Sequence, residues 1–597
     1  MKLSKSALRQ RLLESVERQV DGILKIYHPG GRFGTEPWIV RDQEVILPLA
    51  VGLTTPESRY FGDAEVLRAV AEGGRFLTEQ QDKLGMYVFR KKDGSTWGDI
   101  YMPWTYLRWV FTFGLIREYL QPEDLEIWET GLLRGYEGIA ATELTVESGR
   151  YRGHPPPKGP PTPGVAKPWL HNIPTHHAAG LFKAGILFER PEWKTKARDY
   201  LHLIVAEQIE DGWWTEHSGP VVVYNQVYLD SLSIYYHTSG DGLVGAALER
   251  GNRYHYHTTY PDGSFIETFD ERNYTYPVAV MESPDGNRTY HPPLVKMHPG
   301  LYASAEGRAL IAFLLEIHAR RGSPIPNAEM MLLFQPEEPF STDGAVLEPE
   351  FTMGSDAVVL RDGPWVNTFS AYTAERTSNR FIQDRQNFFS LFHQSIGLLF
   401  GGGNTKIQPL WSTLTVGHPG LVSPVGSTAD SELVPDSDLD YVAETARLLR
   451  TASGRGVRLE SAGAILELQV ILISDERAEV RIRLLRAAPD GRPACCHIPL
   501  IPYPGERVGF ADETEHELEE DPWVVEGVSA FDYCGWHFSV EPRGKMIWPA
   551  RAHNPYTKDG HSALGEARLV LSLPLDEEKA YRVCLEGPKD AVTSPGM

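Results

Sequence analysis

Cysteine is scarce in this sequence of 597 residues, and so are long hydrophobic runs and positive charge. All the cysteines lie in the last fifth of the chain, without CxxC spacing: Cys495, Cys496, Cys534 and Cys584. This pattern excludes a disulfide scaffold and a cysteine-rich zinc site. Because free cysteine behaves mostly as a small core residue, we expect four buried free thiols.

Hydrophobic runs are too short for a membrane span, since no stretch reaches about 18 consecutive apolar residues. The start of the chain, "MKLSKSALRQRLLESVERQV", is charged and amphipathic and lacks the continuous apolar segment of a signal peptide. We therefore expect a cytoplasmic protein without a membrane partner, although secretion through a trimmed leader stays open.

Positively charged residues are fewer than negatively charged ones, with 58 Lys and Arg against 80 Asp and Glu, and the formal net charge is −22. This balance excludes a nonspecific nucleic-acid partner. An anionic sugar can still bind such a protein, but only at a local cluster of Arg, His and amide groups.

Length predicts at least two domains, because one hydrophobic core does not grow to this size. Apolar residues recur at helical spacing in four segments of the first half: 63–81, 101–120, 193–209 and 304–322. In the last of these, Ser304 is the expected N-cap and Gly322 the expected stop.

Between these helices an Asp-Gly pair followed by an aromatic residue recurs, at Asp93, Asp211 and Asp262. Asp-Gly marks a tight turn. The repeat is too irregular for a solenoid and favours a ring of helical hairpins, an α/α toroid, over residues 1–325. Its loops at one end would line a cleft.

The second half is typical of β structure. "DAVVLRDGPWVNTFSAY" predicts two strands joined at Asp362-Gly363, and "AEVRIRLL" alternates, with Val480, Ile482 and Leu484 on one face. The fold class is therefore α+β multidomain, with the toroid followed by an antiparallel β-sandwich over residues 326–597. A Pro-rich segment at 152–168 is either a stiff linker or one wall of a cleft.

One stretch gathers unusual polar groups at the start of a helix. "PWLHNIPTHHAAGLFKAGILF" contains Asn172, His176 and His177. In structural terms Asn172 is a good N-cap, and one of the adjacent histidines should face the core or a backbone carbonyl. In functional terms, the amide and the imidazoles are suited to a catalytic site.

This stretch, "DGWWTEHSGPVVVYNQVYLDSL" and "DRQNFFSLFHQSIGLLFGGGN" together resemble the heparinase II/III-like polysaccharide lyases and their alginate-lyase relatives. Matching positions are Asn172, Gly185, Asp211, Gly212, Glu216, Ser218 and Tyr224. The sequence departs from the family at Ile173 and near Gln383, where the family has histidines. The resemblance implies a toroid, a β-sandwich and an active site in the cleft between them.

The implied reaction is β-elimination next to a uronic acid, expected to be of the glucuronate type, which leaves a 4,5-unsaturated uronate. It requires neutralisation of the carboxylate, a base for the C5 proton and an acid for the leaving oxygen. Asn172 suits the first role and Tyr224 the other two, with His176 and His177 as further catalytic candidates. The expected substrate-binding residues are Trp213, Trp214, Glu216, Asn225, Tyr228, Gln383 and Arg385, with one of the two tryptophans in the cleft.

Two other functions fit the same residues. A glycoside hydrolase would need a carboxylate pair, for which the candidates are Glu216, Asp230, Glu267 and Asp270. A non-catalytic sugar-binding protein would need no proton transfer, in which case Tyr224 is a core residue. We expect a uronate-containing oligo- or polysaccharide as the partner, no cofactor and no metal, since the His255-x-His257 pair has no third ligand at a suitable spacing.

Overall fold

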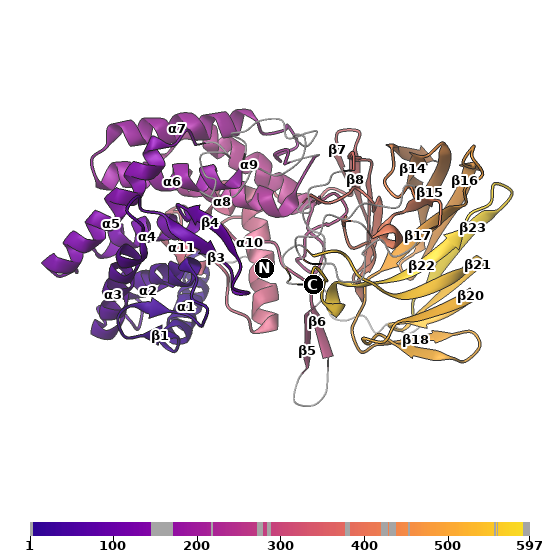
Figure 1. The fold of residues 1–597 in the computed structure, drawn as a ribbon, viewed down its shortest axis with the longest axis horizontal. Coiled ribbons are helices and arrows are strands. Elements are labelled where there is room, and N and C mark those ends of the chain that lie inside the picture. Colours follow the sequence, from indigo (N-terminus) through magenta and orange to yellow (C-terminus); the bar gives the residue numbers. More distant parts are fainter. Residues whose placement is uncertain are drawn as a thin grey trace.

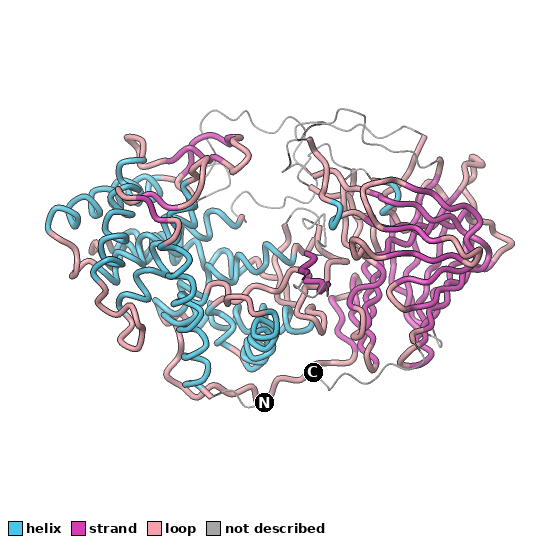
Figure 2. The backbone as a smooth tube through the Cα atoms, turned by 90° about the horizontal axis from the view of Figure 1, so that it is seen from below, coloured by secondary structure: helices cyan, strands magenta, loops and turns pink. Residues whose placement is uncertain are grey.

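The computed structural model places helices on one side of the molecule and strands on the other, joined by loops (Figures 1 and 2). The Pro-rich segment 152–168 and Ser218 lie outside the described residues, so the structure adds nothing to either prediction. The described residues are 4–144, 171–216, 219–271, 279–282, 288–376, 382–406, 408–418, 428, 438–451, 454–554, 557 and 559–588.

The helical part contains the following α-helices in chain order: α1 (Lys5–Leu24), α2 (Ile46–Thr54), α3 (Ala64–Gln80), α4 (Pro103–Ile116), α5 (Pro122–Ala141), α6 (Asn172–Leu187), α7 (Pro191–Ala206), α8 (Val222–Ser239), α9 (Gly242–His257), α10 (Ala305–Arg321) and α11 (Ala328–Leu333). Short 3₁₀ segments precede α2 and α10: η1 (Val40–Val45) and η2 (Pro299–Ala303). Small hairpins are formed by β1 (Tyr27–His28) with β2 (Arg32–Phe33), β3 (Tyr87–Arg90) with β4 (Thr96–Ile100), and β5 (Ala279–Glu282) with β6 (Arg288–His291).

Helix α10 begins and ends where its sequence predicts. The Ser304 side chain caps the first turn by accepting a hydrogen bond from the Gly307 N–H, and Gly322 ends the helix with φ of 61°. Glycine adopts this left-handed conformation without the steric cost that other residues have.

Helices α4 and α6 run in the same direction. The Trp104 ring lies 5.9 Å from the His176 ring, and the Lys183 Nζ lies 5.1 Å from the Phe111 ring. From the first contact to the second, the residue number rises in both helices. The amino ends of α4 and α6 therefore lie at the same end of the helical part.

Helices α6 and α8 are parallel for the same reason. His176 Nδ1 lies 2.8 Å from Ser231 Oγ, and one to two turns later the Phe182 ring lies 4.8 Å from the Tyr235 ring. Parallel neighbours that alternate in sequence with the outer helices α5 and α7 are the arrangement expected of an α/α toroid. The amino ends of α4, α6 and α8 open at one shared end.

The β part is built from antiparallel strands: β7 (Glu350–Met353), β8 (Ala357–Asp362), β9 (Trp365–Ser370), β10 (Phe389–His393), β11 (Gly397–Phe400), β12 (Leu414–Val416), β13 (Thr445–Thr451), β14 (Gly454–Ser461), β15 (Ala464–Ser474), β16 (Arg477–Arg486), β17 (Ala494–Leu500), β18 (Arg507–Phe510), β19 (Glu515–Glu517), β20 (Trp523–Tyr533), β21 (Trp536–Ala550), β22 (Arg568–Pro574) and β23 (Ala580–Glu586). The predicted hairpin at Asp362-Gly363 is confirmed as β8 and β9. In β16, Val480, Ile482 and Leu484 are buried, as the alternation predicts.

The long strand β21 belongs to two layers. Its first part, from His537 to Glu541, pairs with β23, which continues through β16, β15, β14 and β13. Its last part, Lys545 to Ala550, pairs with β22, which continues through β17 to β11 and β12. Strand β20 follows β21 along its length, with register shifts at the bend.

The expected fold class, an α-rich first part followed by an antiparallel β part, is confirmed. The division at residue 325 stays a prediction. Helix α11 ends at Leu333, and β7, the first strand of the β part, begins at Glu350. All four cysteines are free, as expected, but only Cys496 is buried; the other three are half-buried. None of the described helices has both the length and the hydrophobicity of a membrane span.

A buried polar junction joins the helical and β parts. The loop after α9 places Glu267 against the turn after β11, where its Oε1 accepts a hydrogen bond from the Gly402 N–H at 3.0 Å. The Asn404 side chain accepts from the Gln386 N–H at 2.9 Å and donates to the Asp270 carbonyl at 3.3 Å. These contacts hold the end of the helical part directly against the β part.

Candidate functional site

Asn172 is the first residue of α6, and its side chain is 4% exposed. The prediction that it caps the helix is wrong, because the cap is His171, whose Nδ1 accepts from the Ile173 N–H at 3.3 Å. The Asn172 side-chain amide makes no hydrogen bond within the described part of the chain. It is therefore a donor and an acceptor that the fold itself does not use.

His176 lies one turn further along α6 and faces α8. Its Nδ1 lies 2.8 Å from Ser231 Oγ, and its Nε2 lies 3.8 Å from the Asp230 carboxylate. Burial raises the pKa of Asp230, but the His176 contact and the positive charge of Arg108 outweigh burial and lower the pKa overall. Asp230 therefore stays ionised and can orient the His176 ring.

His177 is buried and contacts the backbone of a neighbouring segment. Its Nε2 lies 2.7 Å from the Tyr101 carbonyl, and burial lowers its pKa to about 4. The ring is neutral at physiological pH, and this contact favours the structural alternative for His177 over the catalytic one.

The two tryptophans after Asp211 are both buried, at 6% and 1% exposure. The Trp214 Nε1 donates to the Ile204 carbonyl at 2.7 Å inside the helical core. The Trp213 ring instead lies edge-on to Tyr372 of the β part, at 6.0 Å. Trp213 is thus at the junction, although it is not exposed there as a sugar platform would be.

Three predicted substrate-binding residues point into the helical core. The Tyr228 hydroxyl donates to Glu216 Oε2 at 2.7 Å, and burial and Glu216 raise the Tyr228 pKa well above its usual value. The Asn225 side chain contacts the Trp214 N–H and His255 Nε2. These contacts hold the loop after Asp211 against the helical core.

Tyr224 is the third residue of α8 and is half-buried. The preceding residue, Val223, donates its N–H to Asp270 Oδ2 at 3.3 Å. Because Asn172 and Tyr224 occupy the amino ends of parallel neighbours, they lie at the same end of the helical part. That end is the one that meets the β part.

Arg385 comes from the β part and closes the same junction. Its guanidinium donates to the Phe269 carbonyl at 2.6 Å and to the Pro220 carbonyl at 3.3 Å, and it lies 3.9 Å from Glu271. At 1% exposure it holds the loop that leads into α8. Gln383, two residues before it, is also buried, and the Gln383 Oε1 has no hydrogen-bond partner in the described part of the chain.

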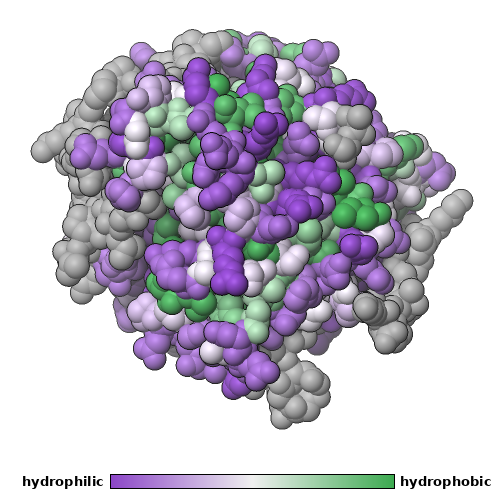
Figure 3. Space-filling view, turned by 90° about the vertical axis from the view of Figure 1, so that its right-hand side faces the viewer, coloured by the Kyte–Doolittle hydropathy of each residue, from purple (hydrophilic) through white to green (hydrophobic). Residues whose placement is uncertain are grey.

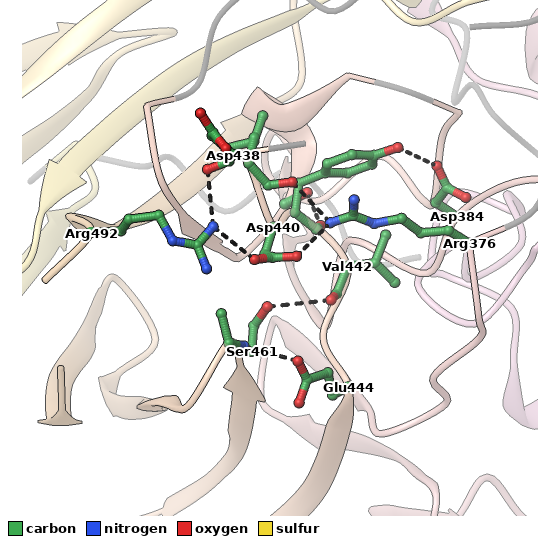
Figure 4. A network of polar contacts seen from close by, with 12 residues as sticks. Arg376, Asp384, Asp438, Asp440, Val442, Glu444, Ser461 and Arg492 are labelled. Carbon is green, nitrogen blue, oxygen red and sulfur yellow. Dashed lines mark hydrogen bonds and ion pairs between the residues drawn. The ribbon is translucent and has the colours of Figure 1, made fainter. Parts of the chain in front are cut away.

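A polar network fixes the two described ends of the loop that leads to Arg385 (Figure 4). Arg376 and Arg492 both bind Asp440, at 3.1 and 2.9 Å. Asp384 binds Lys406 at 3.2 Å and accepts from the Tyr441 hydroxyl at 3.3 Å. The β part thereby presents Tyr372 and Arg385 on an anchored segment.

Sequence reasoning missed three charged residues inside the helical ring: Glu44, Arg108 and Glu329. Arg108 of α4 lies 3.7 Å from Glu44, and its charge also acts on Asp230 and Glu329. Burial raises the Glu329 pKa, and the Glu329 Oε2 has no hydrogen-bond partner among the residues that the structure describes. The available signal was Arg108 itself, the only charged residue of the apolar segment 101–116.

The carboxylates proposed for a hydrolase are held in separate contacts. Glu216 binds Tyr228, Asp230 faces His176, and Asp270 accepts from Val223 at the start of α8. Glu267 is fully buried, and burial raises its pKa to about 7. Among the described residues, no group of three or more His, Cys, Asp or Glu side chains is arranged to hold a metal ion.

Comparison with known proteins gives structural matches only. No protein-family model matches the sequence, and no curated protein sequence does. A Paenibacillus xanthan lyase matches with a TM-score of 0.53 and 11% identity, over 98% of this chain and 57% of its own length. This chain thus spans little more than half of that lyase.

Two further lyases match over most of both chains. Heparinase III gives a TM-score of 0.51 at 12% identity, over 95% of this chain and 81% of its own. A chondroitin AC lyase from Streptomyces coelicolor A3 gives 0.51 at 12% identity, over 98% and 80%. These matches confirm that the chain has the fold of toroid-and-sandwich polysaccharide lyases.

Proposed function

We propose that this protein is a polysaccharide lyase that cleaves next to a uronic acid by β-elimination. The observation that carries the proposal is the end of the helical ring where α4, α6 and α8 begin. There, Asn172 presents an amide without a hydrogen-bond partner among the described residues, Tyr224 lies on the neighbouring helix, and the β part packs against the same end. Sites of this kind favour domain junctions.

The parallel helices favour an anionic substrate at this end. Each helix amino terminus carries a partial positive charge from its aligned peptide dipoles and unpaired N–H groups. Three such ends open together, in a protein whose overall charge is negative. A uronate carboxylate bound there accepts from the Asn172 amide, and its neutralisation makes the C5 proton more acidic.

Tyr224 supplies the proton transfers. As a phenolate it takes the C5 proton, and as a phenol it returns a proton to the glycosidic oxygen as the C4–O bond breaks. The products are a new reducing end and an unsaturated uronate. His176, held between Ser231 and Asp230, lies one turn beyond Asn172 and serves to position that end of α6.

The test of this function is the substitution Tyr224→Phe, assayed on uronate polymers by the ultraviolet absorbance of the unsaturated product. We expect kcat to fall by about 10²–10⁴-fold, because general acid–base groups contribute that much, while substrate affinity changes little. Tyr119→Phe is the matched control, since Tyr119 is 45% exposed and remote from the junction.

Other results would identify the alternatives. Wild-type protein that binds the polymer and forms neither unsaturated product nor new reducing ends is a sugar-binding protein. New reducing ends without ultraviolet absorbance indicate a hydrolase. A Tyr224→Phe variant that keeps more than about a tenth of the wild-type kcat removes Tyr224 from the mechanism, since so small a loss lies below the acid–base range.

A further inference from the structure

The outer face of the layer formed by β15, β16, β23 and β21 is hollowed into an open groove of about 550 Å³. Four cations, Arg481, Arg483, Lys579 and Arg582, line it, with only two carboxylates, Glu467 and Glu541. Figure 3 views the molecule from the side where β16 and β23 lie in Figure 1, and hydrophilic side chains predominate on that surface. The groove is remote from the amino ends of α6 and α8.

The register of the strands brings like charges together. Arg481 of β16 lies directly opposite Arg582 of β23. Like charges in directly opposed positions destabilise a sheet. The two arginines are about half exposed, and their partners, Glu479 and Glu541, each satisfy one of them. The opposed pair therefore places two guanidinium groups side by side at the groove, each with one carboxylate partner.

Arg483 adds a cation that the fold does not pair. Its opposite residue on β15 is Glu467, but that carboxylate binds Arg458 on the next strand, with 2.7 Å between Arg458 Nε and Glu467 Oε1. Arg483 is exposed and makes no ion pair with any described carboxylate. Its guanidinium is free to bind an anion from solution, and a planar guanidinium matches a carboxylate with two parallel hydrogen bonds.

We propose that this groove is a second binding site, for a chain of carboxylate-bearing sugars. The row from Gln469 through Arg481 and Arg582 to Glu541 crosses four strands. Three strand spacings of about 4.8 Å make a path of roughly 14 Å, longer than one sugar ring. The cations bind the carboxylates, while Glu467, Glu541 and Gln469 accept or donate to hydroxyl groups. The ligand class rests on the proposed function, and the groove would hold the polymer while a distant part of it is cleaved.

The experiment compares the double variant Arg483→Gln/Arg582→Gln with a control of equal charge change, Arg9→Gln/Arg507→Gln. Arg9 of α1 is half-buried and Arg507 of β18 is exposed, each has a carboxylate partner, and both lie outside the groove. Binding to hyaluronan, chondroitin sulfate, heparan sulfate, xanthan and alginate is measured by affinity electrophoresis, with dextran as a neutral probe. Thermal melts verify that both variants are folded.

We expect the groove variant to bind the preferred polymer about tenfold more weakly than the wild type, with a smaller dependence on salt, since two charge-assisted contacts are lost. The control should bind as the wild type does. For a short oligosaccharide, kcat and KM should be unchanged, because it does not reach both sites. Equal binding by the groove variant and the control overturns the inference, as does the absence of binding to every acidic polymer.

The experiments distinguish failure of the proposed lyase function from failure of the proposed groove. If the groove variant loses polymer binding and no unsaturated product is formed by the wild type, the groove stands and the lyase function fails. If product is formed and the groove variant binds and degrades the polymer like the control, the lyase function stands and the groove fails.

Discussion

Neighbouring residues at the start of α6 have different roles, which the sequence alone does not distinguish. His171 caps the helix, Asn172 leaves its amide without a partner, and His177 binds a backbone carbonyl. From the sequence, Asn172 was an equally good cap, because Asn is favoured at that position. The distinction depends on which side chain turns back toward the Ile173 N–H, and local preferences do not determine this.

Asn172 gives a prediction at this scale. Asn172→Ala should lower kcat/KM by about 10²–10³-fold, the cost of removing one donor aimed at developing charge. The melting temperature should stay within the error of measurement, because the fold makes no use of the amide. Asn252→Ala is the matched control: the Asn252 Nδ2 donates to the Gly300 carbonyl at 2.8 Å, so its loss should lower the melting temperature and spare kcat/KM. A variant of Asn172 with full activity would exclude it from the carboxylate site.

At the scale of elements, the loop after α9 is the part that most depends on the rest of the chain. Its Asp-Gly turn at 262 was recognisable in the sequence, and so were the turn after β8 and both ends of α10, since each follows from local residue chemistry. The contacts of Glu267 with Gly402, and of Asn404 with Asp270, join residues about 135 positions apart. No local pattern predicts such pairs, so the sequence predicted the elements of the site and missed the contacts that hold them together.

Glu267 makes the stability of this loop depend on pH. Burial raises its folded-state pKa to about 7, above the unfolded value of 4.5. The folded protein therefore holds this proton more tightly than the unfolded chain does, and stability falls as pH rises from 4.5 to 7. The loss amounts to about 3 kcal/mol across that window.

Glu267→Gln should remove this dependence, since the amide oxygen still accepts from the Gly402 N–H and carries no charge. We expect the free energy of unfolding, measured by denaturant titration at pH 5 and pH 8, to differ less in the variant than in the wild type. At pH 8 the variant should be the more stable of the two. A variant with the same pH slope as the wild type would show that Glu267 stays ionised in the folded state.

At the scale of the whole molecule, the helical and β parts share an interface of buried charged and polar groups. Glu267, Asp270, Glu271, Arg385 and Asn404 are each at most 1% exposed. The hydrogen bonds that these groups make across the interface are lost when either part unfolds alone, and each contributes about 0.5–1.5 kcal/mol to stability. The two parts should therefore unfold together.

Differential scanning calorimetry tests this coupling. We expect one transition, with a ratio of van't Hoff to calorimetric enthalpy near one. Asn404→Ala removes contacts to both sides of the interface, so it should lower the melting temperature and broaden or split the transition. Two resolved transitions in the wild type would show that the parts are thermodynamically independent.

The shared strand β21 has a consequence for how the protein is made. One layer is completed only when β21 pairs with β23, and the other only when β21 pairs with β22. All three strands follow residue 535, so a ribosome must synthesise strands β7 to β20 before either layer can close. Until then β16 and β17 present unpaired edges, which are the surfaces that recruit other chains. The helical part, whose contacts are mostly between neighbouring helices, can fold early, whereas the β part is completed only after its last strands emerge.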